Sequence, residues 1–187
     1  MSVLVLVGNP RPKSRTLQIA LQAAEAVAGR AGHAGEPDVV DLSELASGLL
    51  GAAPPPEVQD ALDRVAQADV LVVASPTYKA TYTGLLKAFL DRLPGGALAS
   101  TVALPLLVMG DPKHSLAVEV HLRPLLVELG ATVPTPGLAF LEAQVPDAAE
   151  VLGAWADLVA PQVSAALAGI TPPPSTTALA NTAGGAR

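Results

Sequence analysis

The segment from Ser75 to Lys87 contains the side chains of this sequence that are best suited to bind a ligand. It holds both tyrosines of a chain that is only 3% aromatic, together with two lysines and four hydroxyl side chains. The backbone of residues 76–79 can line the edge of a flat ring, with N–H groups donating to ring carbonyls and Tyr78 packing nearby. Alternatively, Tyr78 and Tyr82 fill a subunit interface, where tyrosine is enriched, and the lysines are solvated surface charges.

A second polar segment, from Gly8 to Thr16, is suited to bind an anion. It lies between an apolar run and the start of an amphipathic stretch, so we expect free N–H groups and the positive end of a helix dipole there. Ser14 and Thr16 add hydroxyl donors, and Arg11 or Arg15 adds charge-assisted hydrogen bonds. The segment lacks both the Gly-Lys-Ser/Thr ending of a P-loop and the three glycines of a dinucleotide turn. A terminal phosphate monoester therefore fits better than a bridging pyrophosphate, and the alternative is an ordinary polar turn capped by serine.

Apolar runs and amphipathic stretches alternate around both segments. Strands are predicted at 3–7, 38–42, 69–74, 101–109 and 136–142, because these runs are short and rich in Val and Leu. Helices are predicted from a cap at Ser14 or Thr16 to Gly29, and at 57–67, 83–92, 115–129 and 146–167. This alternation predicts a parallel sheet covered on both faces, and it fits a three-layer, flavodoxin-like α/β fold with strand order 2-1-3-4-5. The segments 8–16 and 75–84 follow strands one and three, at the switch point where such sheets bind ligands.

Three prolines and the C-terminus modify this pattern. Pro105 lacks an amide donor, so we expect an irregularity at that point of the fourth strand. Pro124 removes one helix hydrogen bond and should kink its helix, and Pro161 should bend or break the last helix. Residues 1–169 are predicted to form one domain. Residues 170–187 are rich in small and turn-forming residues without apolar periodicity, and we expect a disordered or draped tail.

Composition limits the partners that the chain can have. Its net charge of −6 and its sequence pI near 4.9 argue against nucleic acid as a main partner. The lack of cysteine excludes disulfides, thiolate metal ligands and cysteine nucleophiles, and the three histidines show no metal-ligand spacing.

The same composition bears on location and assembly. We expect a cytoplasmic protein, because the apolar N-terminus is too short for a signal peptide and no unbroken apolar run reaches the roughly 20 residues of a membrane span. Only 15% of the residues are charged, below the usual quarter. This low value indicates either an oligomer that covers further apolar surface or an alanine-rich coding bias.

Three sets of residues together resemble a known family. They are Gly8-Asn9-Pro10-Arg11 with Ser14-Arg15-Thr16, Ser75-Pro76-Thr77-Tyr78-Lys79 with Tyr82-Thr83-Gly84-Leu85-Leu86-Lys87, and His114 ahead of Leu122-Arg123-Pro124. In these residues the chain is similar to the NADPH-dependent FMN reductases of two-component monooxygenase systems, close to the flavin reductases of alkanesulfonate use. The resemblance extends from Met1 to about Leu167, and its most specific part is the Pro-Thr-Tyr-Lys segment with the Gly-Leu-Leu-Lys continuation.

The resemblance implies a flavodoxin fold with an FMN site. It implies a phosphate held by Arg11, Ser14, Arg15 and Thr16, and an isoalloxazine against Pro76, Thr77, Tyr78 and Lys79, with Gly110 and Asp111 on the far side. Asn9 belongs to the same cofactor-binding set, at a position where family members often carry serine. NADPH or NADH would stack its nicotinamide on the exposed face of the ring.

The resemblance also implies an oligomer. Family members assemble as dimers or tetramers, with the segment around Tyr82 and the helix containing Pro124 at the contacts. Some members carry a π-bulge with an extra aromatic residue or histidine before the Arg-Pro pair. The residues at that place here are Val120 and His121.

The cofactor determines the predicted reaction. Hydride passes from nicotinamide C4 to flavin N5 while the protein aligns the two rings and excludes water, so no catalytic side chain is predicted. We therefore expect an NAD(P)H-dependent FMN reductase, with a monooxygenase as candidate recipient of the reduced flavin. The alternatives are a reductase that retains FMN and reduces quinones, azo dyes or metal oxyanions, a flavodoxin-like electron carrier that binds no nicotinamide, and a protein of this fold without flavin.

Overall fold

Five apolar runs pair into one parallel sheet. The computed structural model describes residues 1–33 and 35–170, and its strands are β1 (Val3–Val7), β2 (Asp38–Asp41), β3 (Val70–Pro76), β4 (Val102–Met109) and β5 (Leu138–Leu141). Their order is β2-β1-β3-β4-β5 with every pair parallel, so the predicted flavodoxin-like topology is confirmed. Every residue of β1, β3 and β4 is buried, which explains why these strands are continuous apolar runs in the sequence.

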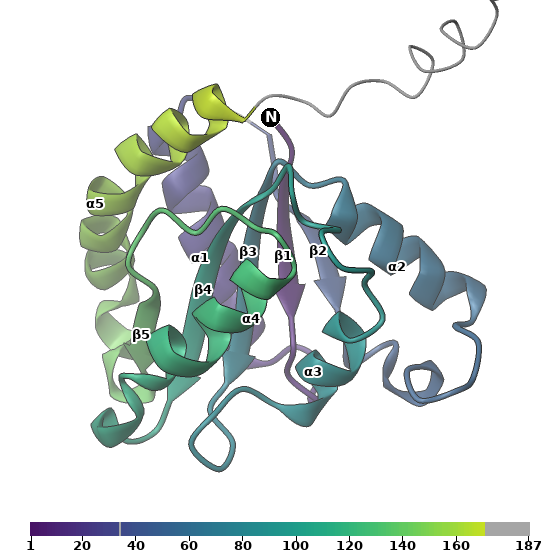
Figure 1. The fold of residues 1–187 in the computed structure, drawn as a ribbon. Coiled ribbons are helices and arrows are strands. Elements are labelled where there is room, and N and C mark those ends of the chain that lie inside the picture. Colours follow the sequence, from purple (N-terminus) through teal and green to yellow (C-terminus); the bar gives the residue numbers. More distant parts are fainter. Residues whose placement is uncertain (34, 171–187) are drawn as a thin grey trace, which may run out of the picture.

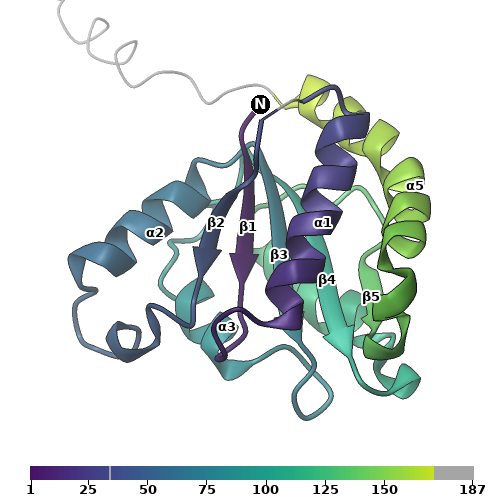
Figure 2. The same ribbon diagram turned by 180° about the vertical axis from the view of Figure 1, so that it is seen from behind.

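Helices cover both faces of the sheet (Figure 1, Figure 2). They are α1 (Arg15–Arg30), α2 (Pro56–Ala66), α3 (Gly84–Leu90), α4 (Arg123–Glu128) and α5 (Ala148–Gly169), with 3-10 turns at Ala46–Gly48, Pro112–His114 and Glu142–Asp147. Helices α1 and α5 lie side by side on the face that Figure 2 brings forward, and α2, α3 and α4 pack on the other face. The sheet is therefore the middle of three layers.

Two apolar cores, one on each face of the sheet, hold these layers together. In β1, Val5 and Val7 belong to the core with α1 and α5, whereas Leu6 belongs to the opposite core, as the two-residue period of a strand requires. Burying one such Val or Leu side chain contributes about 1.5–3 kcal/mol relative to leaving it exposed. The pairing of Val7 with Ala74 then fixes the carboxyl ends of β1 and β3 beside each other.

Pro105 does not disturb β4 itself. This strand pairs with β3 continuously through Pro105, so the irregularity expected within the strand is not found there. The pairing on the other edge of β4 is interrupted instead, between a bridge at Thr132 and the start of β5 at Leu138. Successive amides of a strand point to opposite edges, and the N–H of Ala103 donates to Thr132. The missing N–H of Pro105 therefore falls in this gap.

The two helix prolines have different effects. The predicted helix over 115–129 is divided into a π-helical turn (Val118–Leu122) and α4, with Pro124 as the second residue of α4. At that position a proline costs little, because the first N–H groups of a helix have no intrahelical acceptor. Pro161 lies inside α5, which runs unbroken from Ala148 to Gly169. Of the two effects expected at Pro161, a bend or a break, the break is therefore wrong.

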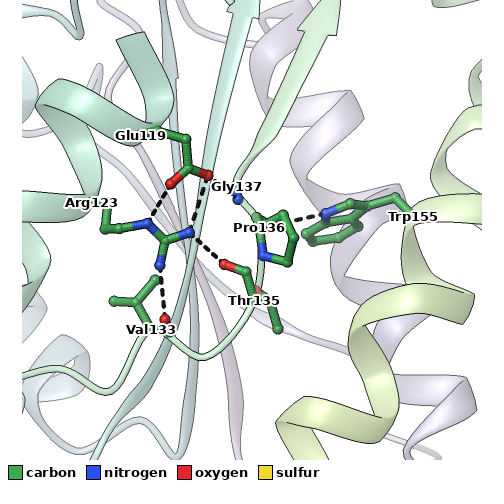
Figure 3. A network of polar contacts seen from close by, with 7 residues as sticks. All are labelled: Glu119, Arg123, Val133, Thr135, Pro136, Gly137 and Trp155. Carbon is green, nitrogen blue, oxygen red and sulfur yellow. Dashed lines mark hydrogen bonds and ion pairs between the residues drawn. The ribbon is translucent and has the colours of Figure 1, made fainter. Parts of the chain in front are cut away.

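An ion pair anchors the π-helical turn to the segment that leads into β5 (Figure 3). Arg123 pairs with Glu119 and donates to the carbonyls of Val133 at 2.8 Å and Thr135 at 2.5 Å. Glu119 Oε1 also accepts the N–H of Gly137 at 2.6 Å. The hydrogen bond from Arg123 is the main cause that lowers the pKa of Glu119. These bonds hold the chain where its sheet pairing with β4 is interrupted.

The C-terminal part of the described chain packs on the core of α1 and α5. Ile170, the last described residue, contacts this core, and the rest of the predicted tail, 171–187, lies outside the described residues. By length and composition alone, the stretch Glu142–Gly169 could cross a membrane. Its buried residues, among them Trp155 and Val159, belong to the same core, so this stretch provides a core helix of the fold.

Candidate functional site

A surface pocket opens at the carboxyl edge of the sheet, where β1 and β3 end. Residues of the loop after β1, the loop after β3 and the turn after β5 line it: Asn9, Arg11, Pro12, Lys13, Ser14, Arg15, Thr16, Pro76, Tyr78 and Glu142. Its volume is about 460 Å³, within the range of small-molecule sites. We call it the loop pocket. Seven of the eleven predicted site residues line it, and the four that do not are Thr77, Lys79, Gly110 and Asp111.

Ser14 begins helix α1 at one wall of the loop pocket. Its Oγ accepts the N–H of Leu17 at 3.2 Å, which is the capping role that the sequence predicts. The N–H groups of Arg15 and Thr16 have no intrahelical acceptor, because they belong to the first turn. Together with the positive end of the helix dipole, these two groups could bind an anion, and we call this position the anion site.

Asn9 shapes the loop that leads into this helix. Its side chain is buried, with Nδ2 donating to Thr16 Oγ1 at 3.0 Å and Oδ1 accepting the N–H of Arg11 at 3.0 Å. The hydroxyl of Thr16 keeps its own proton for donation. Lys13 has φ of +52°, a left-handed conformation that costs about 1–2 kcal/mol for a residue with a Cβ. Strain of this kind is concentrated at functional sites.

Three cations surround the anion site, although the protein is acidic overall. Arg11, Lys13 and Arg15 line the loop pocket and are exposed. Across from them, Glu142 Oε2 pairs with Arg15 Nη1 at 3.1 Å. Neither Lys13 nor Glu142 was predicted from the sequence as a site residue. The position of Lys13 within the anion-binding segment was a usable signal, whereas nothing in the local sequence around Glu142 points to this site.

A buried hydroxyl joins the two walls of the loop pocket. Thr83 Oγ1 donates to the carbonyl of Gly8 at 2.5 Å and accepts the N–H of Leu86 at 3.1 Å, which caps α3. The N–H of Thr83 donates in turn to Ser75 Oγ at 3.0 Å. A Cβ at position 8 would lie 2.6 Å from Leu86 Cβ, so glycine is needed for α3 to approach β1 this closely. These roles of Gly8 and Thr83 were not predicted from the sequence.

The loop after β3 folds into a two-residue hairpin. Tyr78 and Thr81 exchange both backbone hydrogen bonds, at 2.8 and 3.3 Å. The residues between them, Lys79 and Ala80, have φ of +52° and +71°, the pattern of a type I′ turn that ordinarily selects Asn-Gly. Each of these two residues therefore carries strain of about 1–2 kcal/mol. The hairpin places Lys79 and Ala80 at its exposed tip.

Backbone pairing decides which amides of this loop remain available to a ligand. The N–H of Thr77 donates to the carbonyl of Val108 at 2.8 Å, the N–H of Tyr78 donates within the hairpin, and Pro76 has no N–H. Four residues, 76–79, were predicted to line a flat ring. Among these described residues, only Lys79 therefore has an N–H that is available to donate to a ring carbonyl. The side chain of Tyr78 is 42% exposed, which leaves its ring free to pack on a ligand.

Gly110 and Asp111 follow β4 beyond the lining of the loop pocket. Asp111 Oδ1 accepts the N–H of Lys113 at 3.0 Å, and its Oδ2 pairs with Lys113 Nζ at 2.7 Å. The side-chain hydrogen bond from Lys113 is the main cause that lowers the pKa of Asp111. Because Pro76 pairs with Val108, these residues continue the same edge of the sheet beside the hairpin.

Comparison with known proteins identifies the family of this chain. A family model described as NADPH-dependent FMN reductase matches residues 1–145. The chain belongs to this family. FMN reductase (NADPH) of Escherichia coli K12 is 35% identical over 156 residues, which are 79% of this chain and 76% of that protein. NADH-dependent FMN reductase SfnF of Pseudomonas fluorescens is 33% identical, over 79% of this chain and 80% of that protein.

Solved structures agree with this assignment. The apo form of an NADH:FMN oxidoreductase (EMOB) has a TM-score of 0.73 at 33% identity, and the match covers 94% of this chain and 92% of that one. An oxidoreductase from Corynebacterium diphtheriae has a TM-score of 0.76 at 29% identity, with 91% and 99% covered. This FMN reductase is therefore a flavin oxidoreductase of flavodoxin-like fold, which uses FMN with NADPH or NADH.

The residues of the loop pocket fit the two ends of FMN. The unpaired amides of the first turn of α1, with Arg11 and Arg15 beside them, form a donor set suited to a phosphate monoester. Tyr78 and the hairpin lie on the adjacent wall of the same pocket, where a ring attached to that phosphate can reach them. Among residues 1–33 and 35–170, no group of three His, Asp or Glu side chains is arranged to hold a metal ion.

Proposed function

We propose that this FMN reductase binds FMN in the loop pocket, reduces it with NADPH or NADH, and releases the reduced flavin to a partner monooxygenase. The observation that carries the proposal is the pocket's composition, a cationic anion site on one wall and Tyr78 with its hairpin on the other. When bound, FMN supplies the N5 atom that accepts hydride from nicotinamide C4.

The residues of this chain bind and orient rather than take part in bond making. Arg11 and Arg15 donate to the phosphate together with the first amides of α1, and Lys79 donates its N–H to a ring carbonyl. Tyr78 packs against the ring and excludes water from one side. Thr83 holds the two loops at a fixed separation, so the ring keeps one orientation in the pocket. Alignment of this kind is what makes a hydride transfer fast without a side-chain acid or base.

Release to a partner is supported by the openness of the site and by the resemblance of the sequence. The cations of the pocket and Tyr78 are all exposed, so FMN bound here keeps contact with solvent. The residues that resemble a known family are those of reductases in two-component monooxygenase systems. A purified protein that loses its yellow colour on dialysis, yet oxidises NADPH or NADH when FMN is added, is the expected result. Colour retained through dialysis would contradict release.

The phosphate contacts give the sharpest test of the proposed site. Arg11→Ala combined with Ser14→Ala removes one guanidinium and the hydroxyl cap beside the anion site. We expect the Kd for FMN to rise by roughly 100-fold, because charge-assisted hydrogen bonds contribute about 1.5–3 kcal/mol each. Riboflavin, which lacks the phosphate, should lose little affinity. Both dissociation constants can be measured by quenching of flavin fluorescence.

Two controls accompany this double variant. Lys87→Ala removes a cation that lies on α3 outside the lining of the loop pocket, and its Kd for FMN should stay near that of the unmodified protein. Thermal unfolding of the double variant shows whether loss of the Ser14 cap, about 1 kcal/mol, leaves the protein folded. An equal loss of affinity for FMN and riboflavin in a folded variant would contradict the phosphate role.

A further inference from the structure

Glu142 is the one carboxylate among the described residues that line the loop pocket. It faces the cations of the proposed phosphate site, and its Oε2 is 3.1 Å from Nη1 of Arg15. A carboxylate at this distance occupies a donor that a phosphate would use. The phosphate of a monoester carries a charge of about −1.5 to −2 near neutral pH, so bound FMN and Glu142 repel each other.

The position of Glu142 is fixed by the sheet. It is the first residue after β5, whose last residue Leu141 pairs with Met109 of β4. The N–H of Leu141 donates to Gln144 Oε1 at 2.9 Å, which closes the turn. The backbone at Glu142 is therefore held at the carboxyl edge of the sheet, within reach of the N-terminus of α1.

We infer that Glu142 weakens the binding of FMN by competing with the phosphate for Arg15 and by repelling the bound phosphate, so that the flavin exchanges instead of remaining bound. This inference rests on the proposed FMN site. It adds to that site a residue that sets affinity and the preference between flavins with and without a phosphate.

The weakness of the Arg15–Glu142 ion pair means that Glu142 competes with the phosphate for Arg15 and does not permanently block the anion site. The side chains of Arg15 and Glu142 are 60% and 49% exposed, and an ion pair in such a setting is weak and screened by salt. A phosphate offers Arg15 stronger, bidentate hydrogen bonds than an exposed carboxylate does. The phosphate therefore displaces Glu142 from Arg15, but the carboxylate stays close enough to lower the net gain.

The test compares Glu142→Gln with the unmodified protein. We expect the Kd for FMN to fall by about fivefold, the upper end of what an exposed charge contributes, while the Kd for riboflavin stays unchanged. The difference between the two proteins in FMN affinity should shrink as salt is raised from about 20 mM to about 500 mM, because screening weakens repulsion between exposed charges. Fluorescence quenching and calorimetry measure binding without any turnover.

Two further variants make the result specific. Glu150→Gln removes a carboxylate in the first turn of α5 that is exposed and outside the pocket lining, and it should leave both dissociation constants unchanged. Glu142→Asp keeps the charge, so its Kd for FMN should stay close to that of the unmodified protein. An effect of Glu142→Gln on riboflavin equal to that on FMN, or an equal effect of Glu150→Gln, would overturn the inference.

The outcomes separate this inference from the proposed function. If the unmodified protein binds FMN more tightly than riboflavin and Glu142→Gln changes neither Kd, the inference fails and the FMN site stands. If the unmodified protein binds neither flavin, the proposed function fails, and the inference fails with it.

Discussion

At the scale of single residues, the hydroxyl of Thr83 satisfies two backbone groups that belong to different loops. It donates to the carbonyl of Gly8 and accepts the N–H of Leu86, and the side chain is only 3% exposed. A buried donor or acceptor that loses its partner costs about 1–3 kcal/mol. One buried hydroxyl thus helps to hold the end of β1 beside the start of α3.

Replacement of Thr83 by valine tests this role. Thr83→Val keeps the shape but leaves the Gly8 carbonyl and the Leu86 N–H without their partner, so we expect a loss of about 2 kcal/mol in the free energy of unfolding. Urea denaturation measures it. Thr81→Val is the matched control, because the described hydrogen bonds of Thr81 involve its backbone. Similar stability losses in both variants would contradict a special role for the Thr83 hydroxyl.

At the scale of elements, the π-helical turn and α4 are attached to the segment before β5 by the pair Glu119–Arg123. The bonds drawn in Figure 3 lower the pKa of Glu119, first through the hydrogen bond from Arg123 and also through the N–H of Gly137, although partial burial opposes them. A carboxyl whose pKa is lower in the folded than in the unfolded protein stabilises the fold above its unfolded value. This stabilisation is lost as the pH falls through the folded value.

Glu119→Gln should therefore have a pH-dependent effect. Near neutral pH we expect the variant to be less stable by about 1 kcal/mol, the amount typical of a hydrogen bond to a charged group that is partly exposed. The difference should persist to about pH 5 and shrink as the pH falls below 4.5 through the folded pKa of Glu119, because the ordinary pKa of this carboxyl is 4.5 and its folded value is lower. Denaturation curves at several pH values measure this. A stability difference that stayed constant over the whole range would argue against the ion pair.

At the scale of the whole molecule, apolar side chains stay exposed along the segment that contains the π-helical turn and α4. Leu116 is 69% exposed, Val120 56% and Val127 54%, and only 15% of all residues carry charge. Burial of this segment by another subunit would remove apolar area from water. We therefore propose a homo-oligomer in which this segment lies at a contact, as the family resemblance implies.

A charge placed on this segment tests the proposed assembly. Val120→Asp should reduce the molar mass measured by size exclusion with light scattering, because burial of an unpaired carboxylate in an apolar contact is costly. Leu50→Asp is the control, since Leu50 is 87% exposed on a distant loop. A mass that is unchanged by Val120→Asp, or lowered as much by Leu50→Asp, would remove this segment from the contact.

Most of the fold could be predicted from the sequence because the physical signals were local and strong. Unbroken Val and Leu runs mark strands buried on both faces, and their alternation with helices leaves few topologies. The Ser14 cap followed from the same local reasoning, whereas the anion-binding role of the segment after β1 stays a prediction. The family resemblance added the prediction, still untested, that residues 76–79 line the flavin ring.

What escaped prediction depends on contacts between distant residues or on backbone strain. Glu142 pairs with Arg15 at the carboxyl edge of the sheet, and the predicted strand order alone does not specify which side chains meet there. The type I′ turn at Lys79 and Ala80 lacks the Asn-Gly signal that such turns usually carry. The 115–129 helix was predicted as one continuous helix, although some family members carry a π-bulge before the Arg-Pro pair, and the structure has a π-helical turn at that place.

The hydrogen bond between Thr83 and Gly8 has a kinetic consequence. Because it ties the two walls of the loop pocket together, separating the walls would cost this bond. The pocket already opens to solvent, so we expect that no slow opening motion is needed. Flavin should then enter and leave by diffusion through the open side. Its association rate would respond to ionic strength, since the attraction of the nearby cations reaches only as far as the surrounding salt allows.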